Sequence, residues 1–427
     1  MKIKFILFPI LLLLLVMNAA AQSNDTLLNA LMKLGPPPSK FDQLLDNLSL
    51  RSYGMLNYYN YDWQIWPDRP SNIDMERIVF EGEYKIKNKF SIFGELEFEH
   101  GGTGVTVEFD RFEEFGEFET DVEKGGEIWF EEFGLKYEHN KYLNFSAGRI
   151  RVPFALNNFR DEPTEFFTTN LPEMEATLLP TAWTEYGAQI KGQMQNWKYY
   201  LATVTSLDGS AFNSANFIRR GIQKRFEYSN AEDMAVAARI DYTMGNEQFI
   251  GASIYYGNSR NNRPKRDLKT DAYVTMFDLH AVYEFEPIEI SALMIYGELQ
   301  NSDKVTYANR NLSNNLNVKR TPVGASAMGY AIDVGLEVYD LLPLLGCKHP
   351  NGELVLFARI DSYDTMHQVA GEVADNPRWD RTTLTYGVNF QPIPEVIFKG
   401  QYALRTNQAA SLNKENTLSF GIGYYIK

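Results

Sequence analysis

The feature that most constrains this chain is an alternation of apolar and polar residues with a period of two, which continues from Arg51 to the end of the chain. Between Met328 and Val338 every second residue is apolar, and the intervening residues are Gly, Ala, Asp, Gly and Glu. The same pattern occurs in residues 90–99 and 274–285. Because successive side chains of a β-strand point to opposite faces, the pattern predicts strands with one apolar face and one wet face.

Sixteen segments of this kind are predicted, which is enough for a closed barrel with an aqueous lumen. The predicted strands are 51–61, 72–84, 90–99, 127–138, 142–150, 184–194, 196–206, 233–242, 247–256, 274–285, 288–299, 324–339, 352–363, 380–390, 394–405 and 417–426. The predicted fold class is therefore all-β, a 16-stranded antiparallel transmembrane β-barrel formed by residues 51–427.

The connections between these strands alternate in length. Those after even-numbered strands are tight turns, such as Gln195 alone or Glu286-Pro287, and only 340–351 is longer. Those after odd-numbered strands are long and polar: 62–71, 100–126, 151–183, 207–232, 258–273, 300–323, 364–379 and 406–416. Long extracellular loops opposite short periplasmic turns are typical of outer-membrane barrels. The alternative, a secreted sandwich or propeller, does not predict this asymmetry.

The first 21 residues predict a secretory signal peptide, with Lys2 and Lys4 before an apolar stretch and Ala19-Ala20-Ala21 at a cleavage site. Residues 22–50 predict a periplasmic extension with two short helices around three consecutive prolines. After the signal, no stretch has the 18 or more apolar residues of a transmembrane helix. We therefore expect a protein of the bacterial outer membrane, in contact with its lipid and lipopolysaccharide.

Composition excludes several classes of function. The chain has 427 residues, 44% of them hydrophobic, with 41 Lys and Arg against 55 Asp and Glu. A formal charge of −14 argues against nucleic acid, which needs clustered basic residues. A single cysteine, Cys347, cannot form an internal disulfide. The five histidines are scattered and no G-x-S-x-G motif occurs, so we expect no metal, no cofactor and no enzyme.

The connection 151–183 is the longest, and it contains too many apolar residues for a loop surrounded by water. We expect it to pack against the nearest surface, which is the lumen wall. Folded inward, its charged residues would narrow and polarise the passage, as charged rings do in channels; they are Arg160, Asp161, Glu162 and Glu165. The alternative is an outward fold, as a cap or a subunit contact.

The alternation also assigns charged residues to the wet face of the strands. The basic candidates for the lumen are Lys136, Arg149, Lys191, Arg239, Arg359, Lys399 and Arg405. Acidic candidates, among them Glu95, Glu97, Asp241, Asp278, Asp333 and Asp361, share that face. Mixed charge of this kind either creates a field that orients polar solutes or only solvates the wall.

The segment 108–132 has the steepest charge in the chain, with eleven Asp or Glu against Arg111 and Lys124. Such a loop either binds a divalent cation through carboxylates or is simply solvated. No D-x-D-x-D-G spacing is present, which favours the solvated loop.

Three stretches carry a resemblance to a known family: 148–154 (GRIRVPF), 179–187 (LPTAWTEYG) and the strand, turn and strand of 384–405. Over most of 51–427 the chain resembles Bacteroidetes-type outer-membrane porins related to the phosphate-selective porin O/P family. The resemblance implies a homotrimer, an inward third loop, and basic pore residues that draw anions. It carries over Arg149, Arg151 and Arg160 as pore-lining candidates. The chain departs from the family in its acidity and in lacking a dense arginine ladder.

The sequence thus predicts an outer-membrane porin, a passive diffusion channel for small hydrophilic solutes or ions, with phosphate or other anions as the solutes that the resemblance implies. The alternative is a plugged barrel that acts as a ligand- or polymer-binding receptor.

Overall fold

A computed structural model describes residues 45–427, apart from 88, 103–104, 111–118, 125, 225–226, 246–247, 314–315, 317 and 347. The chain divides into two units, Met1–Ser49 and Leu50–Lys427. The predicted signal peptide and nearly all of the predicted extension lie outside the described residues. The second unit contains the predicted barrel.

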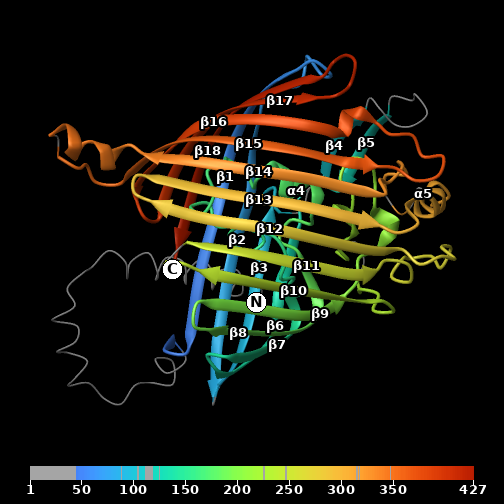
Figure 1. The fold of residues 1–427 in the computed structure, drawn as a ribbon, viewed down its shortest axis with the longest axis horizontal. Coiled ribbons are helices and arrows are strands. Elements are labelled where there is room, and N and C mark those ends of the chain that lie inside the picture. The colour runs from blue at the N-terminus through green and yellow to red at the C-terminus, as the bar shows by residue number, and fades with distance from the viewer. Residues whose placement is uncertain are drawn as a thin grey trace, which may run out of the picture. The chain divides into compact units, whose positions relative to one another are not determined.

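Sixteen antiparallel strands form a closed barrel, in which β1 and β18 pair from Ser52↔Ile426 to Trp63↔Glu415 (Figure 1). They are β1 Leu48–Trp63, β2 Asn72–Lys87, β3 Phe90–Glu99, β6 Ile128–Asn140, β7 Leu143–Arg151, β8 Thr184–Met194, β9 Trp197–Thr205, β10 Met234–Thr243, β11 Phe249–Asn258, β12 Tyr273–Phe285, β13 Ile288–Leu299, β14 Ser326–Glu337, β15 Glu353–Gln368, β16 Asp380–Ile393, β17 Val396–Asn407 and β18 Lys414–Ile426. Each corresponds to one predicted segment, with ends that differ by at most five residues. The predicted fold class is confirmed.

The rim that holds the long connections carries a small sheet and a helix (Figure 1). A two-stranded sheet of β4 Val105–Asp110 and β5 Glu119–Lys124 lies in the connection after β3, and α5 Ser302–Arg310 lies in the one after β13. Neither the small sheet nor α5 was predicted. The possible cation site in 108–132 falls largely outside the described residues. Among the residues that are described, no group of three His, Cys, Asp or Glu could hold a metal ion.

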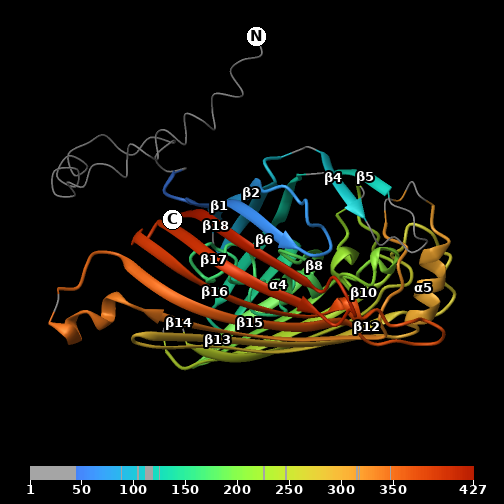
Figure 2. The same ribbon diagram turned by 90° about the horizontal axis from the view of Figure 1, so that it is seen from above.

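The outer face of the barrel is apolar because one residue of each alternating pair points away from the lumen. On β12, Phe277 and Leu279 are 49% and 62% exposed, whereas Asp278 and His280 between and beside them are each 2% exposed. In the described part of the chain no helix is both long and apolar enough to cross a membrane. Figure 2 shows the strands forming a curved wall around the inner segments.

A charge at the middle of this outer face should be costly. Leu279→Arg is expected to lower the free energy of unfolding in lipid vesicles by about 2–4 kcal/mol, because the guanidinium would lie in hydrocarbon. Leu344→Arg is the matched control, since Leu344 is 82% exposed in the short helix Pro343–Leu345 between β14 and β15. Reversible urea unfolding of both variants checks this, and equal losses would contradict the assignment of the outer face to lipid.

Candidate pore constriction

Residues 152–183, the lumen loop, leave the wall after β7 and return to it at β8. They contact the inner side of strands all around the barrel. The Ala155 N–H donates to Asp278 on β12 (2.9 Å) and the Met174 N–H to Asp361 on β15 (3.1 Å). The carbonyl of Thr169 accepts from Asn57 on β1 (2.9 Å). The prediction that this connection folds inward is therefore correct.

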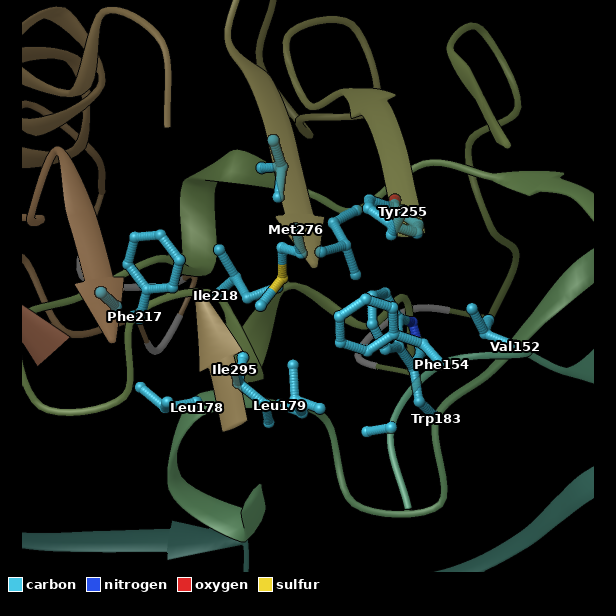
Figure 3. Packing of buried hydrophobic residues seen from close by; sticks show 14 of the residues in the cluster. Val152, Phe154, Leu178, Leu179, Trp183, Phe217, Ile218, Tyr255, Met276 and Ile295 are labelled. Carbon is cyan, nitrogen blue, oxygen red and sulfur yellow. The ribbon is translucent and has the colours of Figure 1, made fainter. Parts of the chain in front are cut away.

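Apolar packing explains why the loop stays inside. Phe154 lies 5.9 Å from Trp183, and Trp183 lies 4.8 Å from Tyr255 on β11, ring centre to ring centre. A second connection, 206–233, adds Phe217 and Ile218 to the same cluster (Figure 3). All five side chains are fully buried. Burying apolar surface contributes roughly 25 cal/mol per Å², so this cluster fills part of the lumen with a core.

The contribution of 206–233 was not predicted. The segment is mostly polar, with a short apolar group at Phe217 and Ile218. Loops have no periodicity that would predict whether a segment folds into the lumen. Two short helices, Gly209–Ala211 and Arg219–Gly221, turn the segment. Lys224, three residues after the second helix, pairs with Glu131 on β6.

Polar anchors fix the lumen loop at several further points. The first is at Ala155, whose φ of +64° places it in the left-handed region. Arg239 donates to the Ala155 carbonyl, while Asp278 accepts from its N–H. His280 lies between Asp278 and Asp241, with its ring nitrogens 2.5 Å and 2.9 Å from their carboxylates. Both backbone groups of one strained residue are thus held by the wall.

The second anchor is Asp161. Its carboxylate lies 3.1 Å from Arg77 on β2 and 3.0 Å from Arg151 on β7, and it accepts from Tyr53 on β1 at 3.0 Å. Burial by itself raises the pKa of the Asp161 carboxyl, but Arg151, Arg77 and the Tyr53 hydroxyl outweigh burial and hold the pKa below its usual range. Asp161 is therefore ionised and ties three strands to one loop residue.

Further wall residues hold the segment from Phe166 to Glu173. Lys399 donates to the carbonyls of Phe166 (2.5 Å) and Thr168 (2.9 Å). The Phe167 ring stacks on Phe357 with 5.6 Å between centres. At the start of α4 Glu173–Leu178, Glu173 pairs with Arg405 at 2.8 Å.

Arg359 completes the wall beneath α4. It pairs with Asp361 at 2.6 Å and also with Asp333 on β14. Because Asp361 also accepts from the Met174 N–H, the arginine supports the helix through its carboxylate partner.

The remaining predicted pore residues are not in one cluster. Arg149 is 2% exposed and lies opposite Tyr186 in the β7–β8 ladder, with its guanidinium 5.4 Å from the Tyr186 ring. Arg160 lies 3.7 Å from Glu289, and Glu162 lies 3.6 Å from Arg51. Lys191 on β8 is half-buried.

A cavity of about 470 Å³, the outer vestibule, lies above the lumen loop on the side of the long connections. Its walls come from β1, β2, β3, β17 and β18, and its floor includes Thr168, Asn170 and Thr177 of the loop. Aromatic residues of β1 and Arg405 also line it. None of these aromatic residues was singled out from the sequence, and Trp63 lies outside the predicted strand 51–61.

Comparison with known proteins agrees with this geometry. Residues 69–425 match the family described as phosphate-selective porin O and P. An uncharacterized protein of Aquifex aeolicus (strain VF5) is 24% identical over 376 residues, which is 86% of this chain and 78% of that protein.

Solved outer-membrane channels share the fold. An anion-selective porin from Comamonas acidovorans is 10% identical, with 89% of this chain and 99% of that chain covered at a TM-score of 0.52. The outer membrane channel DcaP of Acinetobacter baumannii is 11% identical, with coverage of 89% and 97% and a TM-score of 0.51. The protein is a porin channel of the bacterial outer membrane, and it belongs to the phosphate-selective porin O and P family.

Proposed function

We propose that this porin passes small hydrophilic solutes and ions down their gradients without favouring phosphate or other anions. The observation that carries the proposal is the pairing of the luminal arginines. Five of these arginines lie within 3.0 Å of a carboxylate oxygen: Arg77, Arg151, Arg239, Arg359 and Arg405. An arginine that draws anions through a pore needs charge that is not neutralised locally.

The eleven predicted pore residues divide by exposure. We propose that Arg160, Glu162, Glu165 and Lys191, which are partly exposed, face the passage. The other seven support the lumen loop or the wall, because they are buried or paired with several groups: Arg149, Arg151, Asp161, Arg239, Arg359, Lys399 and Arg405.

Single-channel conductance in a planar bilayer, with the reversal potential read under a KCl gradient, tests the proposal. We expect stable stepwise currents and a weak preference for K⁺ over Cl⁻. A strong Cl⁻ preference would contradict the neutralised arginines and support the family's anion selectivity. A silent bilayer with folded, heat-modifiable protein would instead support a plugged receptor.

The proposal includes a homotrimer that contacts outer-membrane lipid and lipopolysaccharide, and it includes no catalytic step. Family membership and the apolar outer face support these points. The mass of the detergent-solubilised complex, measured with the bound detergent subtracted, tests the trimer, and a monomer mass would exclude it.

Ionisation of Glu165 should make selectivity depend on pH. The pKa of the Glu165 carboxyl is raised to about 8. Burial is the main cause, and the Glu162 carboxylate raises the pKa by more than Arg160 lowers it. The group is therefore neutral below pH 8 and negative above it. We expect the ratio of K⁺ to Cl⁻ permeability to rise roughly two- to fivefold between pH 7 and 9, as one added charge predicts. Reversal potentials of Glu165→Gln should lack this step, and an unchanged step in the variant would assign it elsewhere.

A further inference from the structure

A row of aromatic side chains lines the outer vestibule. Tyr59, Tyr61 and Trp63 alternate along β1 and are half-buried on its luminal face. The Tyr59 and Tyr61 rings are stacked, with 6.1 Å between centres and 15° between planes, and the edge of Trp63 meets Tyr61 at 5.4 Å. Tyr58, on the opposite face of the same strand, is 37% exposed and stacks with Phe420 on the outside. The strand thus presents a row of aromatic rings to the cavity.

One flat cation of the chain, the guanidinium of Arg69, already lies over these rings. The guanidinium of Arg69, in the connection after β1, lies 3.9 Å from the Tyr61 ring centre and 4.1 Å from that of Trp63. Trp66 also lies 5.3 Å away. The turn is held by backbone hydrogen bonds from Trp66 N to Trp63 O and from Arg69 N to Trp66 O, both 3.1 Å. Guanidinium groups stack on aromatic faces through cation–π attraction, so these rings have the geometry to accept a delocalised cation.

The next ring in the row, Tyr59, shares a hydrogen-bond donor with a carboxylate. The amide nitrogen of Asn57 donates to both the Tyr59 hydroxyl (3.1 Å) and Glu76 (2.5 Å). The Tyr59 ring and the Glu76 carboxylate are therefore neighbours in the cavity wall. A flat cation stacked on Tyr59 would lie beside this carboxyl group.

Acidic side chains outnumber basic ones in the cavity as a whole. Seven carboxylates line it, together with four arginines and His100. One of the seven, Asp361, pairs with Arg359 behind the wall. A volume of about 470 Å³ is within the range of small-molecule sites. Cavity walls of one predominant sign raise the local concentration of opposite charge, so anions are disfavoured here and cations are favoured.

We propose that the outer vestibule binds flat organic cations, such as guanidinium, amidinium or protonated aromatic amines, which stack on Tyr59, Tyr61 and Trp63 and pair with the carboxylates of the wall. Arg69 is the internal occupant of part of this site. The inference deepens the proposed function, and rests on it, because it names a solute class that the channel concentrates at its outer mouth.

Benzamidine and its neutral isostere benzamide are matched probes for this site. The first readout is quenching of tryptophan fluorescence in the full-length protein in detergent. The second is interruption of single-channel current by probe added on the side of the long loops. We expect benzamidine to act in both at concentrations where benzamide, maltotriose and inorganic phosphate do not.

Three variants assign the binding to the aromatic row. Tyr61→Leu should weaken benzamidine binding about two- to fivefold, as the loss of one cation–π contact predicts. Arg69→Gln should strengthen it, because the internal competitor is removed. Tyr58→Leu, on the opposite face of the strand, should leave it unchanged. Heat-modifiability in gel electrophoresis verifies that each variant is folded.

The outcomes separate this inference from the proposed channel. Stepwise currents without any effect of benzamidine in either readout would overturn the cation site and leave the porin intact. Equal binding of benzamide, or preferential binding of maltotriose or phosphate, would overturn the cation site and show instead that the vestibule binds neutral solutes or anions. If the bilayer is silent but benzamidine binds in a way that depends on Tyr61, the cation site is supported and the proposed channel is contradicted.

Discussion

Replacing Asp161 with alanine is expected to release part of the lumen loop and to raise single-channel conductance. The variant removes the only partner that Arg77, Arg151 and Tyr53 share among the described contacts. Breaking a buried ion pair by deleting one member costs about 3–5 kcal/mol, and here the cost falls mainly on the loop. The wall arginines keep other carboxylates, since Arg77 still pairs with Glu97 at 2.6 Å.

Two matched variants, Asp161→Asn and Glu162→Ala, test whether the effect comes from the charge of Asp161. Asp161→Asn retains an acceptor for Tyr53 but loses the charge, so an intermediate conductance is expected. Glu162→Ala removes a partner of Arg51, whose side chain is 42% exposed. Exposed pairs contribute about 0–1 kcal/mol, so little change in the stability of the loop is expected from this variant, although the charge that it removes faces the passage. Hydrogen exchange of the backbone amides around Asp161 should accelerate only in the Asp161 variants. Unchanged exchange and conductance in Asp161→Ala would show that apolar packing alone holds the loop.

The same anchor should weaken in acid. Because the folded-state pKa of Asp161 is depressed, its stabilising contribution is present above the pKa of the unfolded chain, near 4. It is lost as pH falls through the lower folded-state value. Any acid-induced change in conductance that depends on Asp161 should therefore appear below about pH 4.

Most of the barrel could be predicted from the sequence because its physical cause is local. In a membrane barrel each strand must place apolar residues on lipid and polar residues on the lumen, so strand identity, face and boundary are all encoded by the period-two pattern. On β12 the pattern assigned Asp278 and Leu279 to opposite faces, and their exposures of 2% and 62% agree. The sheet of β4 and β5 was missed because the acidic residues of 108–132 obscure the alternation of its two strands.

The constriction could be predicted only in part. The apolar composition of 151–183 predicted that this connection packs against the lumen wall, and the alternation predicted which charged residues face inward. Pairing was not predictable, because Arg359 and Asp333 meet across strands and Asp161 reaches Arg77 from a loop without periodicity.

Glycines on the luminal face indicate in the sequence where the lumen loop approaches the wall. A Cβ at Gly335 would lie 2.4 Å from the Phe167 ring, and one at Gly329 would lie 2.6 Å from Met174. These positions alternate with lipid-facing residues on β14, so they belong to the luminal face. Glycine on that face marks where a side chain of the lumen loop approaches the wall.

Arg359→Leu is expected to have the second large effect, on stability and on selectivity together. Arg359 is 3% exposed and is the cation that pairs with both Asp333 and Asp361. Its removal leaves two carboxylates together in a buried position, at a cost of about 3–5 kcal/mol. Since Asp361 also holds the Met174 N–H, α4 should loosen, and the uncompensated negative charge should shift the reversal potential toward K⁺. Urea unfolding in vesicles and bilayer recordings measure the two effects.

A second substitution distinguishes charge from packing as the cause. Adding Asp333→Leu to Arg359→Leu removes one of the two orphaned carboxylates, so part of the lost stability and part of the selectivity shift should return. Asp333 interacts with few other groups, of which Ser291 at 2.9 Å is the described hydrogen-bond donor besides Arg359. In a pair that interacts directly, the two substitutions are not additive. If the double variant instead loses the sum of the two single losses, Arg359 stabilises the wall by its packing, and its charge contributes nothing to the selectivity of the constriction.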